Sequence, residues 1–367
     1  MDSKKYLADW YDAIGFLEQQ NGGAILNGVP IPMLQTDIVD EIKNPGKEGT
    51  LDVDHIFTAM CVVVGLDEHF PYASDYIAFL KENLEDTLRA LEGKILSASK
   101  SDDAERVYLF AHAKEILRGS IEDRLDTTYA MEGIYNLRWY EDEGKSSEDL
   151  LKEIMDRYEA ILEEDPDNTH ALMALGRVHE AREHWIKAKF YYEKALQSSD
   201  DDGIKEELRR AIETVTEPAA IDGAKTYLHY GRYEDALKSL DEVSSQYTDP
   251  GKCTYIKGMA YYGLGDYERA VDYLEEASRH TKAGDVLNDY AIALAALGRE
   301  EDAIGVLTET IENNEEDRTA YMNRGILYYR SEAFSEALCD FEAAYHLASD
   351  SQLWELIEQT RKLTNEE

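Results

Sequence analysis

An internal repeat limits the folds that are open to the second half of this chain of 367 residues. Four segments align without gaps: GMAYYGLGDYERAVDYLEEA, AKTYLHYGRYEDALKSLDEV, AIALAALGREEDAIGVLTET and GILYYRSEAFSEALCDFEAA. Each has an alanine at one shared position, and these alanines follow one another at steps of 34, 33 and 34 residues: Ala236, Ala270, Ala303 and Ala337. A fixed period of this length is typical of stacked helical units, each too small to bury its own apolar face.

A fifth copy, GRVHEAREHWIKAKFYYEKA, lies upstream of these four. Its alanine, Ala188, stands 48 residues before Ala236, so one step of the repeat is longer than the others. The segment GIKEELRRAIETV, residues 203–215, has the apolar spacing of a helix and fills the additional length. We therefore expect one extra turn and helix to be inserted between the fifth copy and the rest.

The five segments resemble the tetratricopeptide repeat, in which a small residue lies where two helices of a hairpin touch and an alanine–aromatic–alanine series follows on the second helix. In the last copy these positions are occupied by Gly325, Tyr328, Ala337, Phe341 and Ala344. The family's usual tryptophan position departs from the pattern and holds Leu172, Ala220, Thr254, Leu287 and Tyr321. The resemblance covers about residues 169–350 and implies an all-α fold, a right-handed superhelical solenoid of helix-turn-helix repeats.

The expected domain organisation has three parts: an N-terminal helical region over residues 1–126, the solenoid over 127–350, and a C-terminal capping helix over 351–367. Within the solenoid we expect a degenerate repeat and five clear ones, at residues 127–168 and then at about 169–198, 217–250, 251–283, 284–317 and 318–350. Two alternatives stay open for the N-terminal region, which is either a cap continuous with the solenoid or a separate effector module.

The N-terminal region has the three- and four-residue apolar spacing of helices. This spacing predicts helices over residues 5–20, 35–42, 52–66, 72–98 and 102–118. The exception is NGGAILNGVPIPML, residues 21–34, which is rich in glycine and proline. We expect an extended surface segment or a short hairpin there.

Charge excludes several classes of partner. The chain has 38 Lys and Arg against 77 Asp and Glu, a formal net charge of −39. Nucleic acids and anionic membrane surfaces need a basic face, so we expect neither as a partner. There is no apolar run long enough to span a bilayer, no secretory signal, and the three cysteines, Cys61, Cys253 and Cys339, are far apart. We therefore expect a cytoplasmic protein.

The sequence does not predict an enzyme. His179, Glu180 and His184 form H-E-A-R-E-H, one residue longer than the zincin pattern, which turns the histidines about 140° apart on a helix. There is no phosphate-binding glycine loop and no serine nucleophile elbow, and carboxylate pairs carry no information in so acidic a chain. We expect no catalytic residue, no metal site and no cofactor.

The resemblance implies where a ligand binds, because fixed positions on the first helix of each repeat line the concave face in this family. Those positions are mainly apolar and aromatic here, with basic residues at the N-terminal end. The candidate groove residues are Met173, Arg177, Lys225, Tyr255, Met259, Tyr262, Ile292, Met322, Ile326 and Tyr329. An exposed apolar strip rimmed by charge is typical of a partner site. The alternative is that neighbouring helices or residues 21–34 cover the strip. Both interpretations hold if residues 21–34 occupy the groove until a partner displaces them.

These observations predict a non-catalytic scaffold or adaptor that binds a protein partner, as a peptide or amphipathic helix, in the concave groove. Arg177 and Lys225 would hold an acidic group of that ligand. No three consecutive repeats have the lysine and asparagine pattern of the subclass that clamps terminal carboxylates. Two alternatives remain: a peptide-sensing regulator whose N-terminal module responds to groove occupancy, and an acidic chaperone or decoy for basic proteins. Residues 1–126 contain no basic recognition helix, which disfavours a DNA-binding output.

Overall fold

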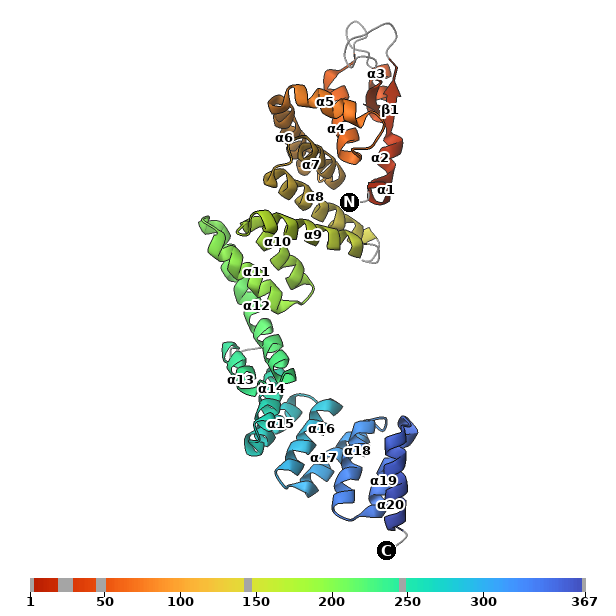
Figure 1. Ribbon diagram of the computed structural model, residues 1–367, viewed down its shortest axis with the longest axis vertical. Helices are drawn as coiled ribbons and strands as arrows, with labels where there is room; N and C mark the ends of the chain where they lie inside the picture. Colours follow the sequence, from red (N-terminus) through yellow and green to blue (C-terminus); the bar gives the residue numbers. More distant parts are fainter. Residues whose placement is uncertain (1–2, 19–28, 44–50, 142–146, 244–248, 365–367) are drawn as a thin grey trace. The chain divides into compact units, whose positions relative to one another are not determined.

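The computed structural model is almost entirely helical, as the sequence predicts (Figure 1). It describes residues 3–18, 29–43, 51–141, 147–243 and 249–364. These residues form two compact units by their contacts, one of residues 1–177 with 194–204 and one of residues 178–193 with 205–367.

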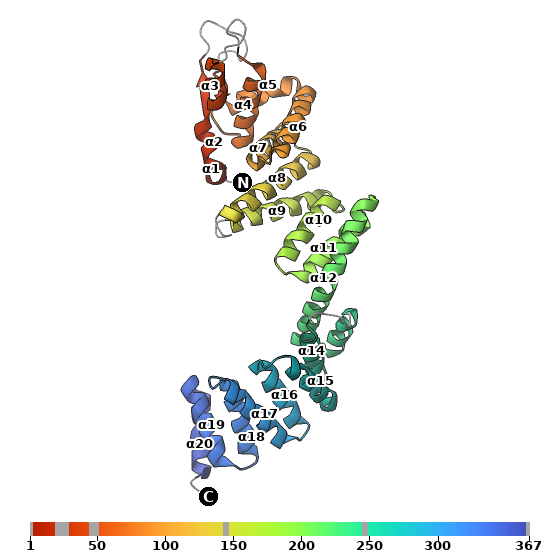
Figure 2. The ribbon, with the colours of Figure 1, turned by 180° about the vertical axis from the view of Figure 1, so that it is seen from behind.

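The first unit begins with two short helices and a β-hairpin and then continues as helices (Figure 2). Its elements are α1 (Ser3–Tyr6), α2 (Ala8–Ala13), β1 (Ile14–Leu17), β2 (Ile31–Leu34), α3 (Gln35–Lys43), α4 (Val53–Leu66), α5 (Ala73–Glu82), α6 (Leu84–Lys100), α7 (Ala104–Arg118), α8 (Ile121–Glu141) and α9 (Glu148–Glu164). Helix α4 packs against β2 and α7, α7 contacts α6 and α8, and α8 packs on α9. The apolar α4 is therefore the centre of this unit's core.

Strand β1 shows that the prediction of one helix over residues 5–20 was wrong. Ile14–Leu17 pairs antiparallel with Ile31–Leu34 of β2, with Ile14 opposite Leu34. All four residues of β2 are buried, so residues 31–34 are not a surface segment but one strand of a hairpin whose other strand, β1, lies before the segment. Residues 21–28 of that segment lie outside the described part of the chain. Cross-strand pairing and burial of Ile14 override the helical spacing here, since strand formation depends on a partner more than on local preference.

The helix predicted over residues 72–98 is interrupted. Helix α5 ends and α6 begins on either side of Asn83, which has φ −129° and ψ 57°, outside the helical region. The hydroxyl of Thr87 donates to the carbonyl of Leu80 at 2.9 Å, inside the protein. This bond satisfies a carbonyl near the end of α5 and stabilises the break, a side-chain effect that apolar spacing does not report.

Next along the chain come α10 (Thr169–Ala181), α11 (Trp185–Ser198) and α12 (Asp202–His229), each of which contributes residues to both units. The inserted helix expected at residues 203–215 is present, but no turn follows it: α12 is one helix of 28 residues with Pro218 inside it. The hydroxyls of Thr214 and Thr216 donate to the carbonyls of Arg210 and Ile212. The insertion therefore lengthens the first helix of the next repeat and adds no separate hairpin.

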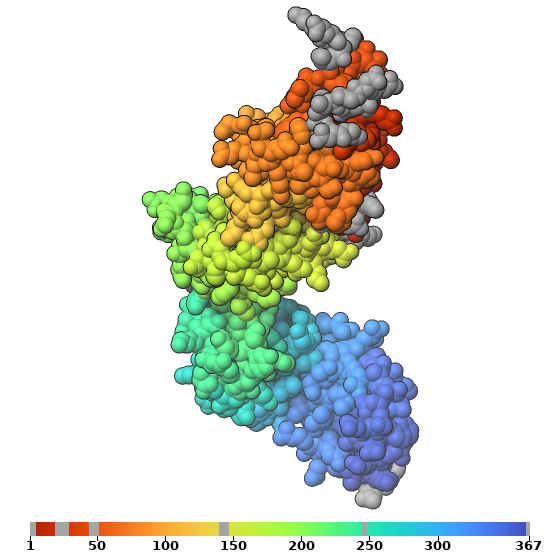
Figure 3. Space-filling view, turned by 45° about the horizontal axis from the view of Figure 1, so that its top comes forward, coloured from red at the N-terminus to blue at the C-terminus, as the bar shows by residue number. Residues whose placement is uncertain are grey.

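The second unit is a row of helices in which each packs against the next in chain order. Its remaining elements are α13 (Tyr233–Ser239), the 3-10 helix η1 (Leu240–Glu242), α14 (Pro250–Gly263), α15 (Tyr267–His280), α16 (Gly284–Ala296), α17 (Glu300–Asn313), α18 (Arg318–Arg330), α19 (Phe334–Leu347) and α20 (Ser351–Thr364). In Figure 3 the residues of these helices, cyan to blue, lie side by side in sequence order.

A left-handed residue turns the chain between the two helices of each hairpin. It stands five positions before the shared alanine in all five copies: Glu183, Gly231, Gly265, Gly298 and Glu332, with φ of 57°, 69°, 78°, 84° and 63°. Glycine adopts this conformation without a steric penalty, whereas glutamate does not. The turn is therefore fixed in register with the repeat even where glycine is missing.

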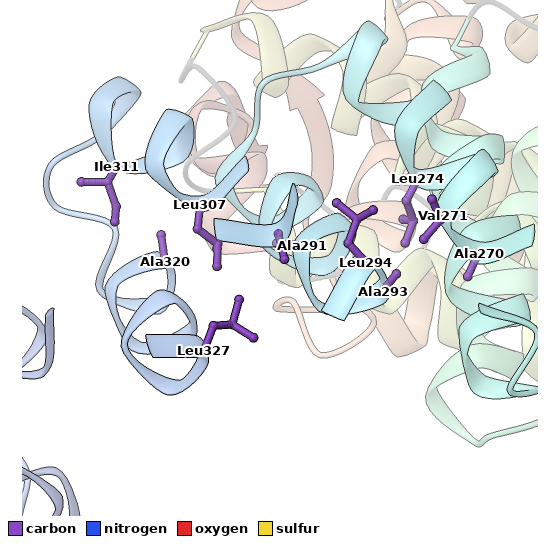
Figure 4. Packing of buried hydrophobic residues seen from close by; sticks show 11 residues of the cluster. Ala270, Val271, Leu274, Ala291, Ala293, Leu294, Leu307, Ile311, Ala320 and Leu327 are labelled. Atoms are coloured by element: carbon purple, nitrogen blue, oxygen red, sulfur yellow. The ribbon is translucent and has the colours of Figure 1, made fainter. Parts of the chain in front are cut away.

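Buried clusters in the second unit extend from one hairpin to the next (Figure 4). One cluster of buried residues takes side chains from α15, α16, α17 and α18: Ala270, Val271, Leu274, Ala291, Ala293, Leu294, Ala303, Leu307, Ile311, Ala320 and Leu327. Four of the shared alanines lie in clusters of this kind, because a small side chain there lets neighbouring helices approach closely. Stacking of hairpins thus supplies the core that one hairpin lacks.

Candidate functional site

The first helices of three successive hairpins lie next to one another in the second unit. Helix α16 contacts both α14 and α18. These three helices carry seven of the eight groove residues that the sequence predicts in this unit: Tyr255, Met259, Tyr262, Ile292, Met322, Ile326 and Tyr329. We call the surface that these seven residues form the groove.

Three groove residues from three different helices line one hollow of about 220 Å³: Tyr262, Ile292 and Ile326. Its other walls are Ala291, Ala295, Ala296, Leu307, Asn323, Leu327 and Arg330. Ile326 is 42% exposed, so its side chain is accessible at the hollow. Most of the residues that line the hollow are therefore apolar, and an amide and a guanidinium add polar groups to its surface.

The other groove residues do not line this hollow. Met322 and Tyr329 pack against the buried cluster of α19 and α20, and the Tyr329 ring meets Phe334 edge-on at 5.5 Å. Met259 and Tyr255 pack against the cluster of α15 to α18. They extend the apolar surface on both sides of the hollow.

Tyr255 joins α14 to α16 through its hydroxyl, which donates to the carboxylate of Asp289 at 2.6 Å. Burial raises the pKa of Asp289, Asp285 raises it further, and the bond from Tyr255 opposes this rise. Burial and the bond to Asp289 likewise raise the pKa of Tyr255. A carboxylate thus faces the groove in surroundings that disfavour its charge.

Amide side chains join α16 to α18. The amide of Asn323 donates to the side-chain oxygen of Asn288 at 3.2 Å. Asn288 in turn donates to the carboxylate of Asp317 at 3.2 Å and to the carbonyl of Gly284 at 2.7 Å. Because Asn288 is only 4% exposed, this network fixes the two helices to each other and leaves Asn323 at the wall of the hollow.

The remaining predicted site residues lie elsewhere. Met173, on α10 in the first unit, is 7% exposed and so offers a ligand almost no surface. Arg177, also in the first unit, is exposed. Lys225 is on α12 in the second unit, exposed, with its ammonium 3.6 Å from Asp222. Arg177 and Lys225 therefore belong to different units, and the described site includes neither.

Three polar residues of the site were missed by the sequence analysis: Asp289, Asn323 and Arg330. Arg330 pairs with Glu300 at 2.9 Å and lines the hollow. Asp289 and Asn323 directly follow positions that the repeat assigns to the concave face, and Arg330 directly follows Tyr329. Including the position after each assigned one would have found all three.

The histidines singled out by the sequence lie in the first hairpin of the five copies. The Nδ1 atoms of His179 and His184 are 3.4 Å apart, and the His179 ring stacks on Tyr191 at 5.4 Å. Burial lowers the pKa of His179 to about 4. Within the described ranges, no group of three or more His, Cys, Asp or Glu residues is placed to hold a metal ion. The pair is explained by packing in the hairpin.

A second hollow, of about 230 Å³, lies in the first unit between the turn before α7 and the helix α8. Asp102, Asp103, Glu132 and Tyr129 are among its lining residues. The hydroxyl of Tyr158 donates to Glu132 at 2.8 Å, and burial raises the pKa of Glu132. This hollow is acidic where the first is apolar.

None of the helices in the described residues has the length and apolar character needed to cross a membrane.

Comparison with known proteins agrees with the repeat pattern. A family model described as tetratricopeptide repeat matches residues 221–286, 255–309 and 288–352. The tetratricopeptide repeat protein 36 homolog of Drosophila melanogaster is 28% identical over 130 residues, which are 34% of this chain and 70% of that protein. Human tetratricopeptide repeat protein 13 is 31% identical over 123 residues, which are 32% of this chain and only 14% of the human protein.

Two solved structures are also similar. The crystal structure of YrrB, described as a TPR protein with an unusual peptide-binding site, is 17% identical and has a TM-score of 0.38, covering 55% of this chain and 97% of that one. The crystal structure of MamA is 21% identical with a TM-score of 0.36, covering 47% of this chain and 94% of that one.

Tetratricopeptide-repeat proteins generally mediate contacts between proteins and are typically not enzymes. Within residues 221–352 the family model, the shared alanines and the turn residues all follow one period. The family model therefore identifies residues 221–352 of this chain as tetratricopeptide repeats.

Proposed function

We propose that this chain is a non-catalytic adaptor that binds a peptide or an amphipathic helix of a partner protein in the groove. The supporting observation is the hollow of about 220 Å³, to which α14, α16 and α18 each contribute one predicted groove residue. A recessed apolar site surrounded by polar groups is how protein interfaces hold their strongest anchors. Methionine and tyrosine on either side of it suit a segment whose side chains vary.

Residues 31–34, the described end of the segment 21–34, give no support to the idea that this segment occupies the groove. They form β2, where Met33 is 0% exposed and packed in the first unit. A partner from outside the chain is therefore the occupant that we propose.

We also propose a cytoplasmic location and a protein partner, with neither nucleic acid nor membrane bound. The support is the net charge of −39, which repels polyanions, and the three cysteines, none of which forms a disulfide.

Affinity capture from a lysate of the source cells tests the proposal. Wild type is compared with Tyr255→Ala/Tyr262→Ala/Tyr329→Ala at low and high salt, and circular dichroism monitors folding. A matched control, Tyr129→Ala/Tyr230→Ala, removes two tyrosines that are 66% and 73% exposed and do not belong to the groove. Ile326→Ser serves as a milder groove variant because its side chain is already 42% exposed.

A partner that is kept by the control, lost by both groove variants and retained at high salt is the expected result. Partners that bind all variants alike and dissociate at high salt would contradict binding in the groove. They would favour an acidic chaperone or decoy, because salt screens interactions between exposed charges.

A further inference from the structure

One face of α16 is acidic in its N-terminal half and apolar in its C-terminal half. Asp285, Asp289, Ile292 and Ala296 follow one another at spacings of three and four residues, so they share that face. The first two are carboxylates in the N-terminal half of the helix, and the last two line the hollow. An acidic site and an apolar site therefore lie next to each other along one helix of the groove.

The two carboxylates have no cationic partner among the residues that the structure describes. Asp289 accepts a bond from the Tyr255 hydroxyl, and Asp285 accepts one from the backbone N–H of Val286. The basic side chains of this part of the unit are held by other acids: Lys252 by Asp249 at 3.2 Å, Lys282 by Glu309 at 3.0 Å and Arg330 by Glu300 at 2.9 Å. A half-buried carboxylate without a cation is unfavourable, and a ligand that brings one relieves this cost.

We propose that the groove recognises a linear segment carrying a lysine or arginine for Asp289 and Asp285 and a large apolar side chain for the hollow. The inference rests on the proposed function and adds the chemistry of the partner. Asp289 and Ala296 are seven residues apart, about 10 Å along the helix. The two groups of the ligand are therefore about three residues apart in an extended segment and about seven apart in a helical one.

Charge complementarity favours this ligand over an acidic one. An acidic group placed beside Asp289 meets two like charges. The one basic group among the lining residues of the hollow, Arg330, is already paired with Glu300. The net charge of −39 adds a long-range attraction for basic segments and a repulsion for acidic ones.

The experiment uses the full chain and a phage-displayed library of random twelve-residue peptides as the probe. Selection on wild type is followed by removal of phages that also bind Ile326→Ser. The enriched peptides are synthesised, and their affinity is measured by fluorescence anisotropy against wild type, Asp289→Asn and Asp285→Asn. Asp289→Asn keeps an oxygen that accepts the Tyr255 hydroxyl. The control, Asp272→Asn, removes the same charge from an exposed position of α15 that does not line the hollow.

The expected result is enrichment of a basic residue at fixed spacing from a leucine, isoleucine or phenylalanine. Asp289→Asn then weakens binding at least tenfold, and Asp272→Asn changes it less than twofold. Enriched peptides without a basic residue, or peptides that bind Asp289→Asn as tightly as wild type, overturn this inference and leave the groove in place. Failure to enrich any peptide that depends on Ile326 overturns the proposed function itself.

Discussion

Gly258 on α14 lies so close to Leu274 on α15 that a Cβ atom at residue 258 would come within 2.6 Å of the Leu274 Cγ atom. The same relationship recurs in the last hairpin, where a Cβ at Gly325 would meet the Phe341 ring at 2.7 Å. In both pairs the second residue lies sixteen positions after the glycine. The glycine therefore sets how closely the two helices of the hairpin approach.

Adding a methyl group at this contact should destabilise the protein. We expect Gly258→Ala and Gly325→Ala each to lower the free energy of unfolding by about 1–3 kcal/mol, because the buried partner has no free space to move into. Urea denaturation followed by circular dichroism measures this. Gly305→Ala is the control: this residue is exposed in α17 with no atom within 4 Å of its added Cβ, so we expect about 0.5–1 kcal/mol of stabilisation. Equal effects of all three substitutions would argue against the close contact.

Substitutions at two of the left-handed turn residues should have opposite effects on stability. Gly298 has φ 84°, so Gly298→Ala should cost about 1 kcal/mol, although the added Cβ meets no atom within 4 Å. Glu332 has φ 63° with a side chain that disfavours it, and Glu332→Gly should raise the melting temperature. Thermal unfolding followed by circular dichroism distinguishes them. A stabilising Gly298→Ala would show that the left-handed conformation is not required there.

A buried ion pair holds α18 to α19. Arg324 donates two bonds to Asp340, at 2.9 and 2.8 Å, and a third to Thr308 at 3.0 Å. The side chains of Arg324 and Asp340 are 16% and 6% exposed. We expect Asp340→Asn to lower the free energy of unfolding by about 3 kcal/mol, because it leaves a guanidinium without its counter-charge.

The double variant Arg324→Met/Asp340→Leu tests that reason for the ion pair. It removes both charges together, so we expect it to be more stable than Asp340→Asn in the same denaturation experiment. A double variant less stable than the single one would mean that the pair contributes through packing and not through charge.

His179 makes the stability of the second unit depend on pH. Its pKa is lowered to about 4, chiefly by burial, with Lys187, His184 and Arg182 contributing in the same direction. Between pH 4 and the ordinary histidine pKa near 6.5, the unfolded chain binds a proton that the folded chain does not. Stability is therefore full above about pH 6.5 and falls as the pH is lowered towards 4.

Denaturation midpoints measured across that range check this pH dependence. We expect His179→Phe, which keeps an aromatic ring beside Tyr191, to flatten the pH dependence relative to wild type. His170→Phe is the control on the same helix, because His170 is exposed. If the profiles of wild type and His179→Phe are parallel, other groups account for the pH dependence.

The repeated half of the fold could be predicted from sequence because each landmark has a local steric meaning. Gly258 and Gly325 mark helix contacts, and Gly265 and Gly298 mark left-handed turns, so the period alone predicts hairpins. The N-terminal region has no period, and strand β1 was missed because Ile14–Leu17 is fixed by β2, some fourteen residues further along the chain. Pairing between distant segments leaves no signal in local apolar spacing.

The apolar part of the candidate site could also be predicted, since Tyr262, Ile292 and Ile326 were identified from their positions and line one hollow. The polar part could not. The bond from Tyr255 to Asp289 joins two helices, and its importance depends on which nearby lysines and arginines are already paired. In a chain with 77 acidic residues, one carboxylate without a counter-charge has no distinguishing mark in the sequence.

The left-handed turn residue stands five positions before the shared alanine in every hairpin, from Glu183 in the first to Glu332 in the last. This interval is unchanged even where α12 lengthens the step between two copies. Length has been added at the start of a first helix and not between the turn and the shared alanine, so the hairpin remains the module that evolution can copy, delete or move. A tandem duplication that begins at Asp249, the residue that caps α14, would bring its own cap, turn and core side chains. Such a duplication would add one more helix to the groove, so descendants of this chain can gain longer ligands by recombination, without a new fold.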